Sequence, residues 1–391
     1  MSDDCLRDLR KKLNRLQGQV ISVTLSGCCD SIQGRVSRVE KESIILTGEF
    51  GTSLISLCAV SSIGTCRVLS YVTNSGVQTD PGNTVSVIDT LTDTVIATIQ
   101  VGNAPIGVAI TPDGQQVYVA NQLDNTVSVI DTSHNKVIAT LRVGIRPLVV
   151  AITPDGKSAY VTNAGTQGVQ DKSISVIDTK KNKVVATITE GVGIFPFGIA
   201  IGNTPAGTRA YVANTINGTV SVLDVNPASP TFNTIIATLT VGNSPIDVAI
   251  TPDGTSAFVT NADDDTVSVI DTATNAVTTI QVGDGPAGVG TGNTPNGTRV
   301  YVLNSEGDTI SVIDADPNSS EFNTVIATIT KGVGDSPSDA ALTPDGRKVY
   351  VPNNFSNTVS VINTETNTII TSIPVGNIPN IVAVGRVCSE L

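Results

Sequence analysis

The chain has 391 residues, a formal net charge of −12, 35 glycines, 3% aromatic residues and no tryptophan. Residues 1–70 carry nine Lys or Arg against seven Asp or Glu, so the negative charge belongs to the rest of the chain. An acidic body repels nucleic-acid phosphates and anionic lipid, which argues against a nucleic-acid partner and against membrane insertion. Abundant Val, Ile, Thr and Gly favour many short strands over helices.

The N-terminal region is predicted to hold an amphipathic helix over residues 3–17, followed by five short apolar runs. The helix is indicated by leucines at helical spacing, at Leu6, Leu9, Leu13 and Leu16. The G-x-V rhythm over residues 18–36 resembles a small Sm-like β-barrel. The Arg-Gly motif with which Sm proteins bind RNA is absent near residues 56–64, so RNA binding is not expected. We interpret residues 1–67 as an attachment or oligomerisation domain.

The N-terminus shows no secretory leader, because MSDDCLRDLRKKLNRLQ is charged throughout, and no apolar run reaches membrane-spanning length. We therefore expect synthesis in the cytoplasm. Cysteines are nevertheless dense here for a reduced compartment, and barrels that resemble this one occur in endospore-forming bacteria. We interpret four of these cysteines as thiols that crosslink subunits of a homo-oligomer or of a spore or cell surface layer: Cys5, Cys28, Cys29 and Cys58.

Seven copies of one tetrapeptide dominate the chain after residue 70: YVTN (71), YVAN (118), YVTN (160), YVAN (211), FVTN (258), YVLN (301) and YVPN (350). A run like VSVID and then one like VIATI follow each copy, and a fourth apolar run leads into the next. Each run has the length of a strand, and the TPDG segments suit tight turns. Four strands in each of seven units predict a mainly β fold, a seven-bladed β-propeller over residues 68–391.

The recurring YVTN, VSVID and PDG elements resemble the YVTN family of β-propeller repeats over about residues 71–385. The resemblance implies a propeller related in fold to the seven-bladed lactonase-like propellers. It implies little about activity, since propellers carry many unrelated functions.

The first and last repeats are incomplete. No strand precedes Tyr71 in its repeat, and the last apolar run, at 380–384, has no partner after it. We expect the two to pair in one blade, which closes the ring and removes free sheet edges. In the other repeats all four strands come from one continuous stretch of chain. Alignment of the closing blade with such a repeat places Cys66 beside Cys388, with Cα atoms within roughly 7 Å, so we predict a disulfide. The alternative is that both are free thiols, or that Cys66 pairs within the barrel.

No catalytic set is recognisable in the sequence. The single histidine, His134, lies in a turn where other repeats place Thr or Lys, and one histidine rules out multi-histidine metal or haem sites. The acidic segments 262–266 and 314–321 could bind Ca²⁺, but they lack EF-hand spacing and are interpreted as solvated loops. The recurring YVxN asparagines and VSVID aspartates are interpreted as structural hydrogen-bonding residues. We expect no cofactor and no metal.

Candidate binding residues appear where the repeats differ. Each blade enters its first strand through V-G-x-x-P, and we expect these entries to ring one mouth of the central channel. One side of this mouth is apolar with a cation, at Ile145, Arg146, Leu148, Phe195 and Phe197. The other side is acidic, at Asp247, Asp284, Asp335 and Asp339. Exposed aromatics beside an arginine are typical of a recognition patch, although the phenylalanines could instead plug the channel as core.

These features favour a non-enzymatic structural or binding protein, with the propeller as a rigid recognition platform. Its partners would be proteins, or copies of itself that associate through the N-terminal barrel. The alternative is a lactonase-like hydrolase or lyase at the channel mouth, which would need several convergent acidic groups to hold a metal.

Overall fold

The computed structural model describes residues 13, 17, 20–25, 31–39, 43–48, 51–56, 60–77, 79–166 and 172–390. The predicted N-terminal helix lies outside them, apart from Leu13 and Gln17, as do Cys5, Cys28, Cys29 and Cys58. The chain divides into two compact units. The first comprises residues 1–68, 132–134 and 386–391, and the second comprises residues 69–131 and 135–385.

The first unit contains an antiparallel sheet in the order β4-β3-β2-β1-β5. Its strands are β1 (Val20–Leu25), β2 (Ser31–Val39), β3 (Ser43–Gly48), β4 (Gly51–Ser56) and the first part of β5 (Val60–Val77). Apolar residues of these strands supply buried side chains, among them Val36 and Ile44. The strands coincide with the five apolar runs of the sequence. β5 is longer than expected, because it continues without a break into the first YVTN motif.

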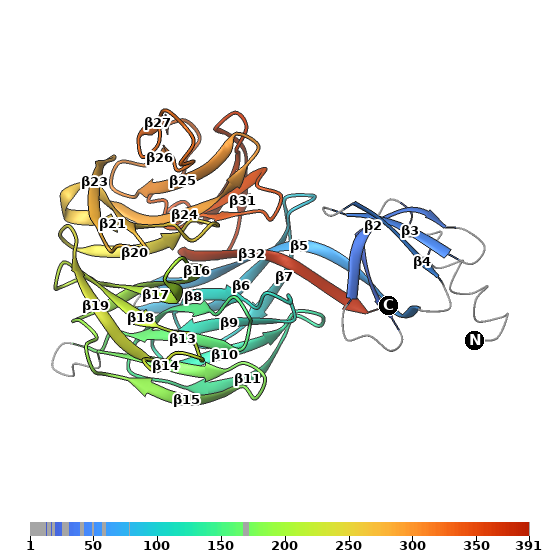
Figure 1. Ribbon diagram of the computed structural model, residues 1–391, viewed down its shortest axis with the longest axis horizontal. Coiled ribbons are helices and arrows are strands. Elements are labelled where there is room, and N and C mark those ends of the chain that lie inside the picture. The colour runs from blue at the N-terminus through green and yellow to red at the C-terminus, as the bar shows by residue number, and fades with distance from the viewer. Residues whose placement is uncertain are drawn as a thin grey trace. The chain divides into compact units, whose positions relative to one another are not determined.

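The second unit contains seven antiparallel blades of four strands (Figure 1). The innermost strands of blades 1 to 7 are β32 (Pro379–Glu390), β8 (Pro105–Ile110), β12 (Pro147–Ile152), β16 (Pro196–Thr204), β20 (Pro245–Ile250), β24 (Pro286–Thr294) and β28 (Ala341–Leu342). The second strands are β5, β9 (Gln116–Asn121), β13 (Ser158–Asn163), β17 (Gly207–Asn214), β21 (Ser256–Asn261), β25 (Gly297–Asn304) and β29 (Lys348–Asn353).

The outer half of each blade follows the same order. The third strands are β6 (Asp80–Asp89), β10 (Thr126–Asp131), β14 (Ser173–Asp178), β18 (Thr219–Asp224), β22 (Thr266–Asp271), β26 (Thr309–Asp314) and β30 (Thr358–Asn363). The outermost strands are β7 (Thr94–Gln100), β11 (Lys136–Arg142), β15 (Lys183–Ile188), β19 (Thr234–Thr240), β23 (Val277–Gln281), β27 (Val325–Ile329) and β31 (Thr368–Pro374). A short 3₁₀ turn, η2 (Ala262–Asp264), joins β21 to β22.

Burial within a blade follows the sequence pattern. The YVxN and VSVID strands are buried on both faces, as β9 and β10 show, because neighbouring blades cover both sides. The outermost strands alternate between exposed and half-buried residues, as in β11. Consecutive innermost strands from β8 to β28 contact one another, which places them around the axis of the ring. The predicted seven-bladed propeller is therefore confirmed.

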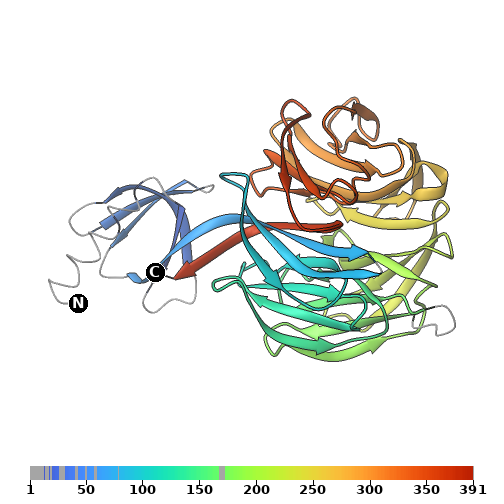
Figure 2. The ribbon, with the colours of Figure 1, turned by 180° about the vertical axis from the view of Figure 1, so that it is seen from behind.

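The ring closes through its two ends, as the sequence predicts. β32 pairs with β5, and Figures 1 and 2 show the two strands side by side. Within this blade the Ile381 N–H donates to Thr73 Oγ1 at 3.1 Å, and the Ser75 N–H donates to the Ile378 carbonyl at 3.0 Å. Blade 1 is thus built from both ends of the propeller.

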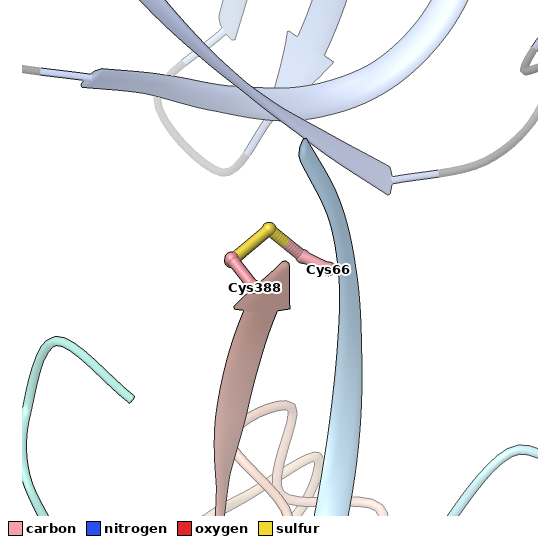
Figure 3. Close-up of a disulfide and its surroundings, with 2 residues drawn as sticks. All are labelled: Cys66 and Cys388. Carbon is pink, nitrogen blue, oxygen red and sulfur yellow. A yellow bond between two sulfur atoms is a disulfide. The ribbon is translucent and has the colours of Figure 1, made fainter. Parts of the chain in front are cut away.

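Cys66 and Cys388 form a disulfide, with their Cα atoms 4.1 Å apart (Figure 3). The bond joins positions 322 residues apart in the chain, one in β5 just before the first YVTN motif and one near the end of β32. The predicted pairing is confirmed, and the alternative of two free thiols is wrong.

The YVxN asparagines bind backbone and side chains inside their own blade. Asn121 Nδ2 donates to Thr126 Oγ1 at 3.0 Å and to Ser128 Oγ at 2.9 Å, and its Oδ1 accepts from the Gly102 N–H at 3.2 Å. The same three bonds recur at Asn214, Asn261 and Asn304. These asparagines therefore hold the second strand to its neighbours, as the sequence predicts.

Candidate functional site at the channel mouth

The residue before each entry proline adopts a left-handed backbone conformation, with φ near +50° to +60° in all seven blades: Ala104, Arg146, Phe195, Ser244, Gly285, Ser336 and Ile378. Arg146 and Phe195 therefore occupy the same turn position in blades 3 and 4. The guanidinium carbon of Arg146 lies 5.1 Å from the centre of the Phe195 ring, within cation–π range. The Phe195 and Phe197 rings lie 6.3 Å apart, and both pack partly against the buried cluster between these blades.

The second residue after each entry proline alternates between glycine and a larger residue around the ring: Gly107, Val149, Gly198, Asp247, Gly288, Asp339 and Ile381. The glycines leave space for the next blade. A Cβ atom at Gly198 would lie 2.7 Å from Asp247 Cα, and one at Gly288 would lie 2.7 Å from Asp339 Cα. Because seven is odd, the alternation fails once, where Asp339 precedes Ile381 with no glycine between them.

Blade 7 also departs from the repeat in its innermost strand, which is reduced to two residues. Its tetrapeptide reads YVPN, so Pro352 offers neither an N–H nor a hydroxyl. In blades 1, 3 and 5 a threonine at this position donates to a carbonyl of the next blade. Ser338 takes over this bond in blade 7, because its hydroxyl donates to the Asn380 carbonyl at 2.6 Å.

A cavity of about 240 Å³ lies at this irregular part of the ring. Its walls come from blades 4, 5, 6, 7 and 1: Phe197, Ile246, Asp247, Ala287, Ser305, Ser336, Ser338, Asp339, Asn354, Asn380 and Ile381. The entries of five blades therefore converge on one polar cavity with an apolar wall, which is the usual form of a small-ligand site.

Asp247 and Asp339 are the two charged residues of the cavity wall, and each reaches across to the next blade. Asp247 Oδ2 accepts from the Val289 N–H at 3.1 Å, and Asp339 Oδ2 accepts from the Val382 N–H at 2.9 Å. Protein surrounds both carboxyl groups, while the cavity leaves part of each residue accessible to water. Burial raises the pKa of Asp247 to about 6. Burial and the nearby charge of Asp247 raise the pKa of Asp339 to about 8.

The structure places three of the sequence candidates, Phe197, Asp247 and Asp339, in the wall of one cavity, and the others lie outside that wall. Leu148 is 1% exposed and packs in the hydrophobic cluster, so it is core and does not line the cavity. Asp284 and Asp335 are exposed outside the cavity wall, so the four aspartates do not converge. Arg146 and Phe195 are half-buried and lie outside that wall.

Sequence reasoning missed the polar residues that complete the cavity, among them Ser338, Asn354 and Asn380. The proline of YVPN was the available signal, because it removes the threonine that fastens the other odd-numbered blades. In the part of the chain that the structure describes, no group of three or more His, Cys, Asp or Glu side chains is placed to hold a metal ion. No helix there is long and apolar enough to cross a membrane.

Two family models match parts of the chain. The YNCE-like beta-propeller model matches residues 48–193, and the model of the seven-bladed beta-propeller lactonase matches residues 144–289. No curated protein matches. Together with the ring of seven four-stranded blades, these matches define the class of protein: a seven-bladed β-propeller with YVTN-like repeats, of the YNCE and lactonase kind.

Many solved structures share the fold. A functionally unknown protein from Desulfotomaculum acetoxidans is 20% identical with a TM-score of 0.68, over 81% of this chain and 98% of its own. Kuenenia stuttgartiensis hydrazine synthase is 25% identical with a TM-score of 0.61, over 78% of this chain and 92% of its own. A proposed 6-phosphogluconolactonase of Bacteroides fragilis is 17% identical with a TM-score of 0.65, over 82% of this chain and 98% of its own.

Proposed function

We propose that this chain is a binding protein whose propeller is a rigid recognition platform, with its ligand site at the channel mouth. The observation that carries the proposal is the cavity to which five blades contribute. The YVxN asparagines serve structure, whereas the wall of this cavity includes residues at which the repeats differ, among them Phe197, Asp247 and Asp339. Two further pockets lie elsewhere on the propeller, one beside Asn243 and Asp263 and one along the outermost strands β15 and β19, and neither joins the entries of five blades.

The rim beside the cavity supports the same function. Arg146 over Phe195 presents a cation and an aromatic ring, and both arginine and aromatic residues are enriched at protein interfaces. Because the backbone at both residues is held by a turn that recurs in every blade, the rim is rigid before a ligand arrives.

A selection of short peptides on the full-length protein tests this proposal. Peptides selected on the unaltered protein are then measured against the double variant Phe197→Ala/Phe195→Ala, with Phe322→Ala as the matched control. Phe322 is 37% exposed and lies outside the cavity wall, in the loop between β26 and β27. We expect the double variant to lose about tenfold in affinity or more, and the control to lose none. Peptides that bind all three proteins equally would refute a site at this mouth.

For the N-terminal region we propose an attachment role, with an Sm-like barrel that anchors or self-associates and a deposition on a spore or cell surface. The crowding of Cys5, Cys28, Cys29 and Cys58 supports it. Non-reducing electrophoresis of oxidised full-length protein should show covalent oligomers that disappear in the variant with all four changed to serine. A protein that stays monomeric after oxidation would contradict crosslinking.

A hydrolase is the second candidate, favoured by the match to the lactonase model over residues 144–289 and by the two carboxyl groups of raised pKa. Asp247 could act as a general base and protonated Asp339 as a general acid. Hydrolysis of simple lactones that is lost in Asp339→Asn would support it, and the absence of turnover would rule it out for that class.

A further inference from the structure

We propose that the cavity at Asp247 and Asp339 binds a primary ammonium group carried on an alkyl stem. The inference rests on the function proposed above, because it names the ligand class of the same cavity.

The ionisable groups of the cavity wall are all acidic. Asp247 and Asp339 are its only ionisable residues, and no lysine or arginine belongs to its wall. Among the described residues, only backbone N–H groups donate hydrogen bonds to these two carboxyl groups. Two enclosed carboxylates would repel each other, so the free protein keeps a proton on this pair, and a bound cation could take the place of that proton.

Three polar side chains of the wall each commit a donor to a backbone carbonyl and keep an acceptor. The Ser305 and Ser338 hydroxyls donate to the Pro337 and Asn380 carbonyls, and Asn354 Nδ2 donates to the Pro379 carbonyl. The oxygen lone pairs of these side chains remain. A ligand that donates hydrogen bonds matches these three acceptors, and an ammonium group has three donors and no acceptor.

The rest of the wall fits an alkyl stem. Ile246, Ile381 and Phe197 line the cavity beside the carboxyl groups, and the face of an aromatic ring attracts a cation. A divalent metal ion fits less well, because the wall offers it only two carboxylates, and its remaining side-chain oxygens are neutral hydroxyls and amides beside an apolar surface.

The test uses full-length protein with its disulfide intact and n-butylammonium chloride as the probe, measured by calorimetry at neutral pH. 1-Butanol is the neutral probe of the same shape, and sodium chloride controls for ionic strength. We expect butylammonium to bind, butanol not to bind, and the double variant Asp247→Asn/Asp339→Asn to lose about tenfold or more in affinity. The double variant Asp284→Asn/Asp335→Asn, which removes two exposed mouth carboxylates, should bind as the unaltered protein does.

A second measurement needs no variant. In protein with ¹³C-labelled aspartate carboxyl groups, butylammonium should shift the two highest titrations to lower pH, because the cation favours the charged carboxylates. Failure of butylammonium to bind, or equal binding by the Asp247→Asn/Asp339→Asn variant, would overturn the proposal. If selected peptides still bind at the mouth but butylammonium does not bind, the recognition function stands and only the proposed ligand class is wrong. Tighter binding of Nα-acetyl-lysine amide than of butylammonium would identify a lysine side chain as the source of the amine.

Discussion

The hydroxyl of Tyr160 in blade 3 donates a hydrogen bond of 2.6 Å to the side-chain oxygen of Asn233 in blade 4. Tyr118 makes the same bond to Asn182 in its next blade. In five blades the tyrosine of the YVxN motif thus fastens its blade to the turn before the outermost strand of the following blade, whereas the buried Tyr211 hydroxyl has no hydrogen-bond partner. At the closure of the ring, the Tyr350 hydroxyl donates to Asp93 instead.

Phe258 breaks this series, and its replacement by tyrosine should stabilise the protein. Asn323 occupies the equivalent turn of the next blade, and its side-chain oxygen is buried without a hydrogen-bond partner. A new hydroxyl at residue 258 would donate a hydrogen bond to this oxygen, and we expect a gain of about 1 kcal/mol in the free energy of unfolding. The gain is measured by urea unfolding. Tyr160→Phe, the matched reverse change, should cost a similar amount, and a destabilised Phe258→Tyr would show that the ring site lacks room.

Stability should fall as the pH rises, because of the two cavity aspartates. Their pKa values in the folded protein, about 6 and about 8, lie above the ordinary 3.8. The folded state therefore holds protons that the unfolded state releases, so the contribution of these two groups to stability is fully present below about pH 4 and is lost as the pH rises toward 8.

Asp339→Asn should flatten this decline and raise stability at pH 8 by about 1 to 3 kcal/mol, because the amide keeps the acceptor for the Val382 N–H without the charge. Chemical unfolding of both proteins across this pH range measures the pH dependence of their stability. Asp335→Asn, at the exposed mouth, should leave the profile unchanged. An identical slope in Asp339→Asn and the unaltered protein would contradict the shifted pKa of Asp339.

Removal of the Cys66–Cys388 disulfide should lower stability. The bond closes a loop of 322 residues, and in the chain-entropy model a loop of this length is worth up to about 5 kcal/mol. We expect Cys66→Ser/Cys388→Ser to unfold at lower denaturant concentration than the oxidised protein. Reductant should bring the unaltered protein down to the level of the variant and leave the variant where it is. Coincident unfolding curves before reduction would show that the bond contributes nothing.

Gly288→Ala should disrupt the ring beside the cavity. A Cβ atom at this position would lie 2.2 Å from the Ser338 carbonyl oxygen, so blades 6 and 7 must move apart. We expect a loss of about 2 kcal/mol or more, as for other overpacked sites. Gly307→Ala is the control, because its nearest neighbours lie 3.6 Å away. Thermal unfolding compares the two, and equal effects would show that the contact at Gly288 is easily relieved.

Much of the fold could be predicted because its signals are local. Strand-length apolar runs, turn residues at fixed offsets and a repeat of 42–51 residues each specify a blade without reference to distant residues. Ring closure could also be predicted, since a count of strands left one unpaired run at each end. Cys66 and Cys388 followed from that count.

The composition of the site could be predicted only in part. Asp247, Asp284, Asp335 and Asp339 all stand beside an entry proline, yet two line the cavity and two are exposed. Asp284 and Asp335 lie two residues before their proline, in the exposed turn, whereas Asp247 and Asp339 lie two residues after theirs. In blades 2 to 6 the innermost strand shifts register just after the proline, as between Pro245 and Val248. A bulge interrupts the alternation of side chains, so strand periodicity cannot say which way the next residues point.

The sequence by itself therefore determined the number of blades, their strand order and the pairing that closes them, because those depend on patterns repeated along the chain. Only the tertiary structure decided that Asp247, Asp339 and Ser338 meet around one cavity. That meeting depends on the glycines between blades, on the odd number of blades and on Pro352. All three features determine contacts between neighbouring blades, and the residues in those contacts are distant in the sequence.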